Sequence, residues 1–141
     1  MDTLKVEWLI VADGAQVVGG KLYVLGGGWD VLTLGQPLPA QHLVAVAVAI
    51  RVPWTQTNKQ HTFRLLVQHE DGDALADAQG SFEVGRPPGL VPGQPQRAQL
   101  AITAGLQFQK LGMYAIVASV NGEEMERTWL RVAAAPGVPI A

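Results

Sequence analysis

The amino-acid sequence predicts an all-β fold, and three observations support this prediction. Apolar and polar residues alternate over short segments, as expected for strands whose successive side chains point to opposite faces of a sheet. Glycine, proline, asparagine and aspartate stand between these segments at short intervals. No segment shows a sustained 3.6-residue helical period. We therefore expect a single-domain antiparallel β-sandwich of about 8–9 strands, immunoglobulin-like or jelly-roll-like, with a closed barrel as the alternative.

The expected strands follow one another along the chain, and each ends at a turn signal. The run Gly26-Gly27-Gly28 allows a bend or bulge, Asp71-Gly72-Asp73 is a hairpin turn, and Asn121-Gly122 favours a type I′ turn. Residues 1–135 are expected to form the domain and residues 136–141 a tail. The expected strands are 5–12, 21–25, 29–34, 43–52, 62–70, 74–84, 98–108, 113–120 and 125–132.

The segment 43–52 is the clearest strand and has two unlike faces. One face carries large β-branched residues and belongs in a core, namely Val44, Val46, Val48, Ile50 and Val52. Between them, the opposite face carries only the methyl groups of Ala45, Ala47 and Ala49. A face that is neither charged nor bulky allows another surface to lie close against it. We therefore expect these three alanines either to form an association interface or to pack internally.

The charge balance narrows the class of partner. The chain has 10 basic and 12 acidic residues, a formal charge of -2, so a nucleic acid is not expected as the main partner. Only 16% of the residues are charged, against roughly 25% in an average soluble domain, and 48% are hydrophobic. A surface with so few charges favours a homo-oligomer or a protein partner over a compact monomer.

Several classes of chemistry and location are not expected from this sequence. There is no cysteine, so disulfides and thiolate sites are excluded. The segment before Trp8 carries charges where a signal peptide needs an apolar region, and no apolar run reaches the ~18 residues of a membrane helix. We expect a cytoplasmic protein that makes no contact with a membrane.

Tyr114 is expected to have a structural role. It lies in Leu111-Gly112-Met113-Tyr114, just before the last predicted hairpin. A glycine and a tyrosine at the start of a late strand resemble the tyrosine corner of immunoglobulin-like sandwiches. We predict that Tyr114 is buried with its hydroxyl bonded to a nearby group.

No group of residues predicts catalysis, a metal or a cofactor. The glycine run lacks the following helix that a phosphate loop requires, and the only serines lie outside a nucleophile-elbow motif. Glu70, Asp71, Asp73 and Asp77 are close in sequence, but their spacing is typical of a solvated turn rather than a calcium site. The three histidines are scattered, and His69 is expected to be partly buried and hydrogen-bonded. The protein is therefore not expected to be an enzyme.

Two loops are the best candidates for ligand binding. Trp54 stands among polar residues and could stack on a sugar or a peptide, and Arg86 lies in the glycine- and proline-rich loop 85–96. Trp29 follows the glycine run and is the third candidate. The structural interpretation is favoured, with Trp54 closing the end of the core, Arg86 anchoring its loop to a carboxylate and Trp29 covering the core edge.

Four segments resemble an uncharacterised bacterial family, a domain of unknown function. The segment 20–30, Gly-Lys-Leu-Tyr-Val-Leu-Gly-Gly-Gly-Trp-Asp, is the most specific of them. The other three are 5–13, 52–55 and 82–89, so that the likeness covers nearly the whole chain. The resemblance implies a small cytosolic β protein and brings no activity, ligand or catalytic residue with it.

Three functions follow in order of preference. The first is a non-catalytic interaction or assembly module that self-associates. The alternative is a small-ligand or carbohydrate-binding module that uses Trp29, Trp54 and Arg86. The third is an enzyme of an unrecognised type.

Overall fold

The computed structural model describes residues 3–139, in which nine β-strands form two sheets. The all-β prediction is therefore confirmed. One sheet has the strand order β2-β1-β4-β7, and the other has the order β3-β9-β8-β5-β6. One short 3-10 helix, Trp54–Gln56, follows β4, and no helix of the described residues is long and apolar enough to cross a bilayer. The strands are β1 (Lys5–Val18), β2 (Lys21–Gly27), β3 (Val31–Leu34), β4 (Ala40–Val52), β5 (Gln60–His69), β6 (Ala74–Glu83), β7 (Gln96–Phe108), β8 (Gly112–Val120) and β9 (Glu123–Ala134).

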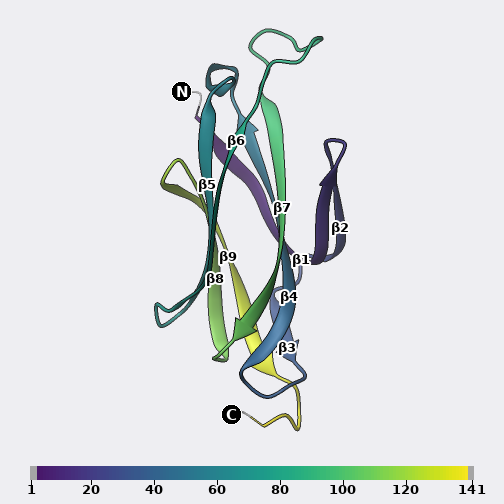
Figure 1. Ribbon diagram of the computed structural model, residues 1–141, viewed down its shortest axis with the longest axis vertical. Coiled ribbons are helices and arrows are strands. Elements are labelled where there is room, and N and C mark those ends of the chain that lie inside the picture. Colours follow the sequence, from purple (N-terminus) through teal and green to yellow (C-terminus); the bar gives the residue numbers. More distant parts are fainter. Residues whose placement is uncertain (1–2, 140–141) are drawn as a thin grey trace.

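The two sheets pack face to face around one hydrophobic core (Figure 1). The β-branched face of β4 points into this core, and Val48, Ile50 and Val52 are at most 1% exposed. Buried residues of the other sheet, such as Ile116 and Leu130, belong to the same core. The predicted inward face of the segment 43–52 is therefore confirmed. Of the predicted domain and tail, residues 1–2 and 140–141 lie outside the described residues.

The prediction of a purely antiparallel arrangement is wrong at one pair of strands. β3 runs parallel to β9, with Val31 opposite Arg131 and Leu34 opposite Ala134. After β2 the chain crosses from one sheet to the edge of the other, and it enters that edge in the same direction as β9 (Figure 1). A crossover of this kind leaves no local turn signal, because strand direction is fixed by a distant partner.

The predicted end of the first strand at residue 12 is also wrong. β1 continues through Asp13 and Gly14 and changes partner there. Residues from Lys5 to Ala12 pair with β4, and residues from Ala12 to Val18 pair with β2. The glycine run closes the base of the resulting hairpin. Gly26 has a φ of 58°, and a Cβ on it would lie 2.3 Å from Asp13 Oδ2, so this position requires glycine.

The β1–β2 hairpin folds back over the outer face of its own sheet and forms a third layer. Figure 1 shows it on the side of β7 and β4 that faces away from the other sheet. Both β1 and β2 approach β7 to Cα–Cα distances of 8 Å or less, although neither is hydrogen-bonded to it as a strand. Gln99 on β7 donates a hydrogen bond of 3.0 Å to the carbonyl of Gly20 in the hairpin turn.

This third layer accounts for the alanine face of β4. Ala45, Ala47 and Ala49 are all 0% exposed within the single chain. Their cross-strand neighbours include Ile10 on β1 and Ala101 on β7. The expected interface at the three alanines is therefore wrong, because side chains without accessible surface cannot contact a partner. The small side chains instead allow a second layer of the same chain to approach closely.

Two predicted turns are confirmed. Asn121 and Gly122 have φ values of 53° and 81°, and a type I′ turn requires positive φ at both central residues. Gly72, with a φ of 105°, lies in the turn between β5 and β6.

Candidate functional site

The site begins at the end of β4, where Trp54 is held between two loops. Pro53 ends the strand and the 3-10 helix carries Trp54. The guanidinium carbon of Arg86 lies 3.8 Å from the centre of the Trp54 ring. This distance gives a cation–π contact, so the two residues that the sequence proposed for a ligand loop are brought together. One face of the indole is covered by Arg86 and is unavailable for stacking on a sugar.

Hydrogen bonds fix this pair in place. Arg86 donates to the Trp54 carbonyl over 2.8 Å through Nη2 and to the Thr57 hydroxyl over 2.7 Å through Nε. The Thr57 hydroxyl in turn donates to the Trp54 carbonyl over 2.7 Å, and Thr57 is only 4% exposed. Arg86 therefore anchors its loop, as the structural interpretation proposed, but through a hydroxyl, a carbonyl and a ring rather than a carboxylate.

A hollow of about 420 Å³ lies next to Trp54 and is lined by cations. Lys5 and Arg51 contribute the charges. The other residues that line the hollow are Thr3, Pro53, Trp54, Gly93 and Pro95. Lys5 and Arg51 are opposite each other on β1 and β4, because the register of the two strands pairs them. Sequence analysis missed both residues. The signal that would find them is this register, which a single sequence does not provide.

An ion-pair cluster continues from Arg51 across the outer face of the sheet. Glu7 accepts hydrogen bonds from Arg97 Nε at 2.7 Å and from Arg97 Nη2 at 3.2 Å, and Arg51 Nη1 lies 3.9 Å from Glu7 Oε2. The hydrogen bond from Arg97 lowers the pKa of Glu7, so this carboxylate stays ionised at neutral pH. The cluster connects β1, β4 and β7 at the end that carries Trp54.

Trp29 lies apart from this site. It follows Gly28, whose amide donates to the carbonyl of Val11 at 2.7 Å, whereas Trp54 lies beside the start of β1. Val11 lies six positions after Lys5 on β1, which is roughly 20 Å along a strand. The Trp29 indole donates to the carbonyl of Gly26 over 2.8 Å and packs against the core. Trp29 therefore covers the core edge and does not combine with Trp54 and Arg86.

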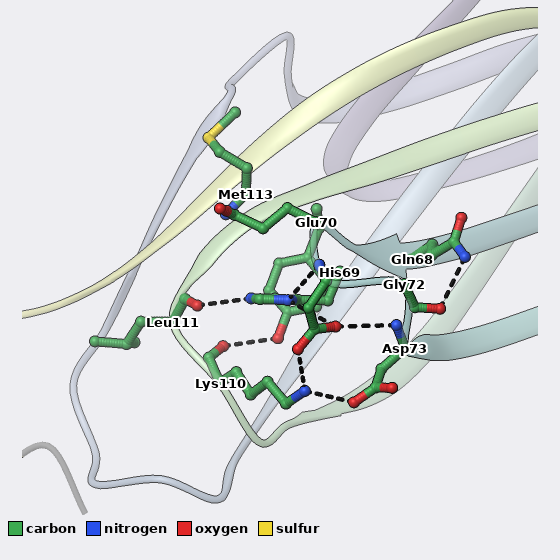
Figure 2. A network of polar contacts seen from close by, with 10 residues as sticks. Gln68, His69, Glu70, Gly72, Asp73, Lys110, Leu111 and Met113 are labelled. Carbon is green, nitrogen blue, oxygen red and sulfur yellow. Dashed lines mark hydrogen bonds and ion pairs between the residues drawn. The ribbon is translucent and has the colours of Figure 1, made fainter.

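At the opposite end of the molecule, a polar network joins the β5–β6 turn to the loop before β8 (Figure 2). The ammonium group of Lys110 lies between the carboxylates of Asp71 and Asp73 and bonds to both. Glu70 accepts a hydrogen bond of 2.5 Å from the amide of Met113. Three of the four clustered carboxylates are thus used to hold two loops together, and Asp77 pairs with Arg64 on the neighbouring strand at 2.8 Å.

Tyr114 anchors the same loop from below. It is 2% exposed, and its hydroxyl donates to the carbonyl of Lys110 over 2.7 Å. The predicted burial and hydrogen bond of Tyr114 are confirmed. Gly112 is needed for this arrangement, because its φ is 121° and a Cβ there would lie 2.9 Å from Glu70 Oε2.

His69 is partly buried and hydrogen-bonded in this network, as predicted. Its Nε2 donates to the Leu111 carbonyl at 2.9 Å, and its Nδ1 lies 3.1 Å from both the amide and a carboxylate oxygen of Asp71. The Leu111 carbonyl, followed by the Asp71 contact, raises the pKa of His69 above its ordinary value. His61 is the most buried histidine in residues 3–139, at 3% exposed, and it bonds to the Gln56 carbonyl at 2.8 Å.

The raised pKa of His69 predicts a pH dependence of stability. A raised folded-state pKa gives stability that is present below the unfolded value of ~6.5 and is lost as the pH rises through the folded value. Asp71 does not contribute to this pH dependence, because the hydrogen bond from Lys110 lowers the pKa of Asp71. The stability that Asp71 provides is therefore lost only in acid. We expect the free energy of unfolding, measured with urea, to fall between pH 6 and pH 8.5, and to fall less in His69→Gln. Equal losses in both proteins would contradict the assignment.

The fold and the site together define an all-β module built from two sheets, with a tryptophan and a group of cations at one end. The chain belongs to a family of unknown function, DUF6941, whose model matches residues 7–133. No curated protein matches the sequence. Among solved structures, the chain is similar to a CARDB domain from Pyrococcus furiosus, solved in complex with di-metal ions. The identity is 16%, the TM-score is 0.41, and the match covers 95% of this chain and 96% of that chain.

Proposed function

We propose that the protein is a non-catalytic β-sandwich interaction module that self-associates through the outward face of the β1–β2 hairpin. The observation that carries this proposal is a set of large apolar side chains on that face. Val18 is 50% exposed, Tyr23 is 55% exposed and Leu25 is 75% exposed. We call these three residues the hairpin face.

The register of the hairpin explains why they share one face. Opposite residues of an antiparallel pair point the same way, and Tyr23 is opposite Gln16 while Leu25 is opposite Gly14. Leu22 and Val24 alternate with them, are half-buried and lie on the other face of the hairpin, where they pair with Val17 and Ala15. Both faces of the segment 21–25 are therefore apolar, and only one of them is covered by the chain itself.

A second copy of this chain is the partner that these features favour. β2 is hydrogen-bonded on one side only, so its other edge is available for antiparallel pairing with the β2 of another copy. Such pairing around a two-fold axis would join the two hairpins into one sheet and place the apolar side chains of the two hairpin faces next to one another. The low charge content of 16% supports the same conclusion.

Sedimentation velocity tests this proposal. We expect the wild-type protein to show a concentration-dependent dimer, and Leu25→Glu and Tyr23→Glu to shift the equilibrium to the monomer by placing a charge on the hairpin face. Because both side chains are exposed, the stability of each folded monomer should change by only about 0.5 kcal/mol. Val91→Glu is the matched control, because Val91 is 64% exposed but lies in the loop before β7. A wild-type protein that stays monomeric at high concentration would overturn self-association.

A further inference from the structure

The hollow beside Trp54 has an electrostatic character unlike that of the chain as a whole. The chain has a formal charge of -2, yet the charged side chains that line this hollow are both cationic, Lys5 and Arg51. The carboxylate of Glu7, which lies 3.9 Å from Arg51, is engaged through both oxygens by Arg97. The hollow is therefore a region of positive potential on a slightly acidic protein.

The two cations retain donors for a ligand. Within residues 3–139, Lys5 makes neither an ion pair nor a side-chain hydrogen bond. Arg51 makes one long ion pair, 3.9 Å to Glu7, and no side-chain hydrogen bond in the same residues. The guanidinium of Arg51 can thus donate two parallel hydrogen bonds to a planar carboxylate or to a phosphate.

The aromatic wall of the hollow is held rigid. Arg86 covers one face of the Trp54 ring at 3.8 Å and bonds to the Trp54 carbonyl, so the indole is fixed before any ligand arrives. Arg86 does not line the hollow, whereas Trp54 does. A fixed aromatic group beside available cations lowers the ordering cost of binding.

We propose that this hollow binds a small ring-bearing anion, such as a sugar acid, through Arg51 and Lys5 at its charged group and Trp54 at its ring. The volume of about 420 Å³ is in the range of small-ligand pockets. The site shares no residue with the hairpin face, so the proposal does not depend on self-association.

An adjoining hollow differs from this one in the sign of its charges. It has a volume of about 460 Å³ and shares Thr3 and Lys5 with the first hollow, but its other charged lining residues are Glu123 and Glu124. Lys5 thus stands between an acidic hollow and a cationic one. An anion is repelled from the first of these and attracted to the hollow of Arg51 and Trp54.

Titrations followed by heteronuclear NMR test the proposal, with glucuronate, glucose and inorganic phosphate as probes. Glucuronate and glucose share a ring and differ in the carboxylate. We expect glucuronate to shift the indole N–H of Trp54, assigned with Trp54→Phe, and the amides of residues 51 and 93. Glucose should bind at least roughly tenfold more weakly than glucuronate, because it lacks the carboxylate and so loses a hydrogen bond between charged groups.

Matched variants locate the effect. Arg51→Gln should weaken glucuronate binding roughly tenfold or more. Arg131→Gln removes an exposed cation from the part of β9 that pairs with β3, away from the hollow, and should leave glucuronate binding unchanged. Equal binding of glucose and glucuronate, equal shifts with phosphate alone, equal effects of the two variants, or no shift at Trp54 would each overturn the proposal.

Discussion

Ala47→Arg is expected to destabilise the protein by at least about 3 kcal/mol, because it places a long cation between two layers of the same chain. Ala47 is 0% exposed, with Ile10 and Ala101 as its cross-strand neighbours. No carboxylate is among these neighbours to pair with the new charge. The guanidinium must therefore displace the β1–β2 hairpin or stay unpaired in the interior. Urea unfolding measures the loss directly.

Leu43→Arg is the matched control for this substitution. Leu43 lies on the same face of the same strand as Ala47, but it is 61% exposed. The same new side chain should change the free energy of unfolding by only about 0.5 kcal/mol there. Hydrogen exchange adds a second measurement, since loss of protection confined to the hairpin would identify displacement of the third layer. Wild-type stability of Ala47→Arg would show that the alanine face is open in solution.

Tyr114→Ala is expected to cost about 3–5 kcal/mol, the range for removing a large aromatic side chain from a core. The Tyr114 ring packs against Phe108 with ring centres 5.3 Å apart and against His69 with ring centres 4.9 Å apart. The substitution leaves a cavity beneath the Lys110 loop and removes the hydrogen bond that anchors it. Thermal and urea unfolding give the total effect.

Tyr114→Phe separates the hydroxyl from the ring. It keeps the aromatic packing and removes only the 2.7 Å bond to the Lys110 carbonyl, so a loss of about 1 kcal/mol is expected. Near-equal losses in the two variants would mean that the ring packing contributes little. A loss near zero in Tyr114→Phe would refute the anchoring role of the hydroxyl.

Most of the fold could be predicted from the sequence, because its signals are local. Alternation predicts the strands, and the inward face of β4 follows directly from the residues 44, 46, 48, 50 and 52. Asn121-Gly122 predicts its own turn type, since few other pairs accept positive φ at both positions. The structural role of Tyr114 could be predicted because a tyrosine at the start of a late strand of such a fold is typically buried with its hydroxyl hydrogen-bonded to the backbone.

The features that could not be predicted depend on contacts between distant segments. The direction of β3 is set by β9, about a hundred residues later in the chain. The alanine face of β4 allows either a partner or an internal layer, and only the position of the β1–β2 hairpin decides between them. Lys5 and Arg51 come together through the register of β1 and β4, and this register cannot be deduced from the sequence alone. Trp54 and Arg86 were identified, but their mutual stacking was not.

The third layer also has a consequence for the order of folding. The hairpin precedes β7 in the chain and is therefore synthesised before the residues that hold it. Gln99 binds Gly20 across 79 positions, and Arg97 binds Glu7 across 90. Until β7 is synthesised, the sheet against which the hairpin packs is incomplete. The inner apolar side of the hairpin and the alanines of β4 then lack part of the surface that buries them. Such long-range closure is typical of slow folding, and it leaves the nascent chain exposed to premature association during that interval.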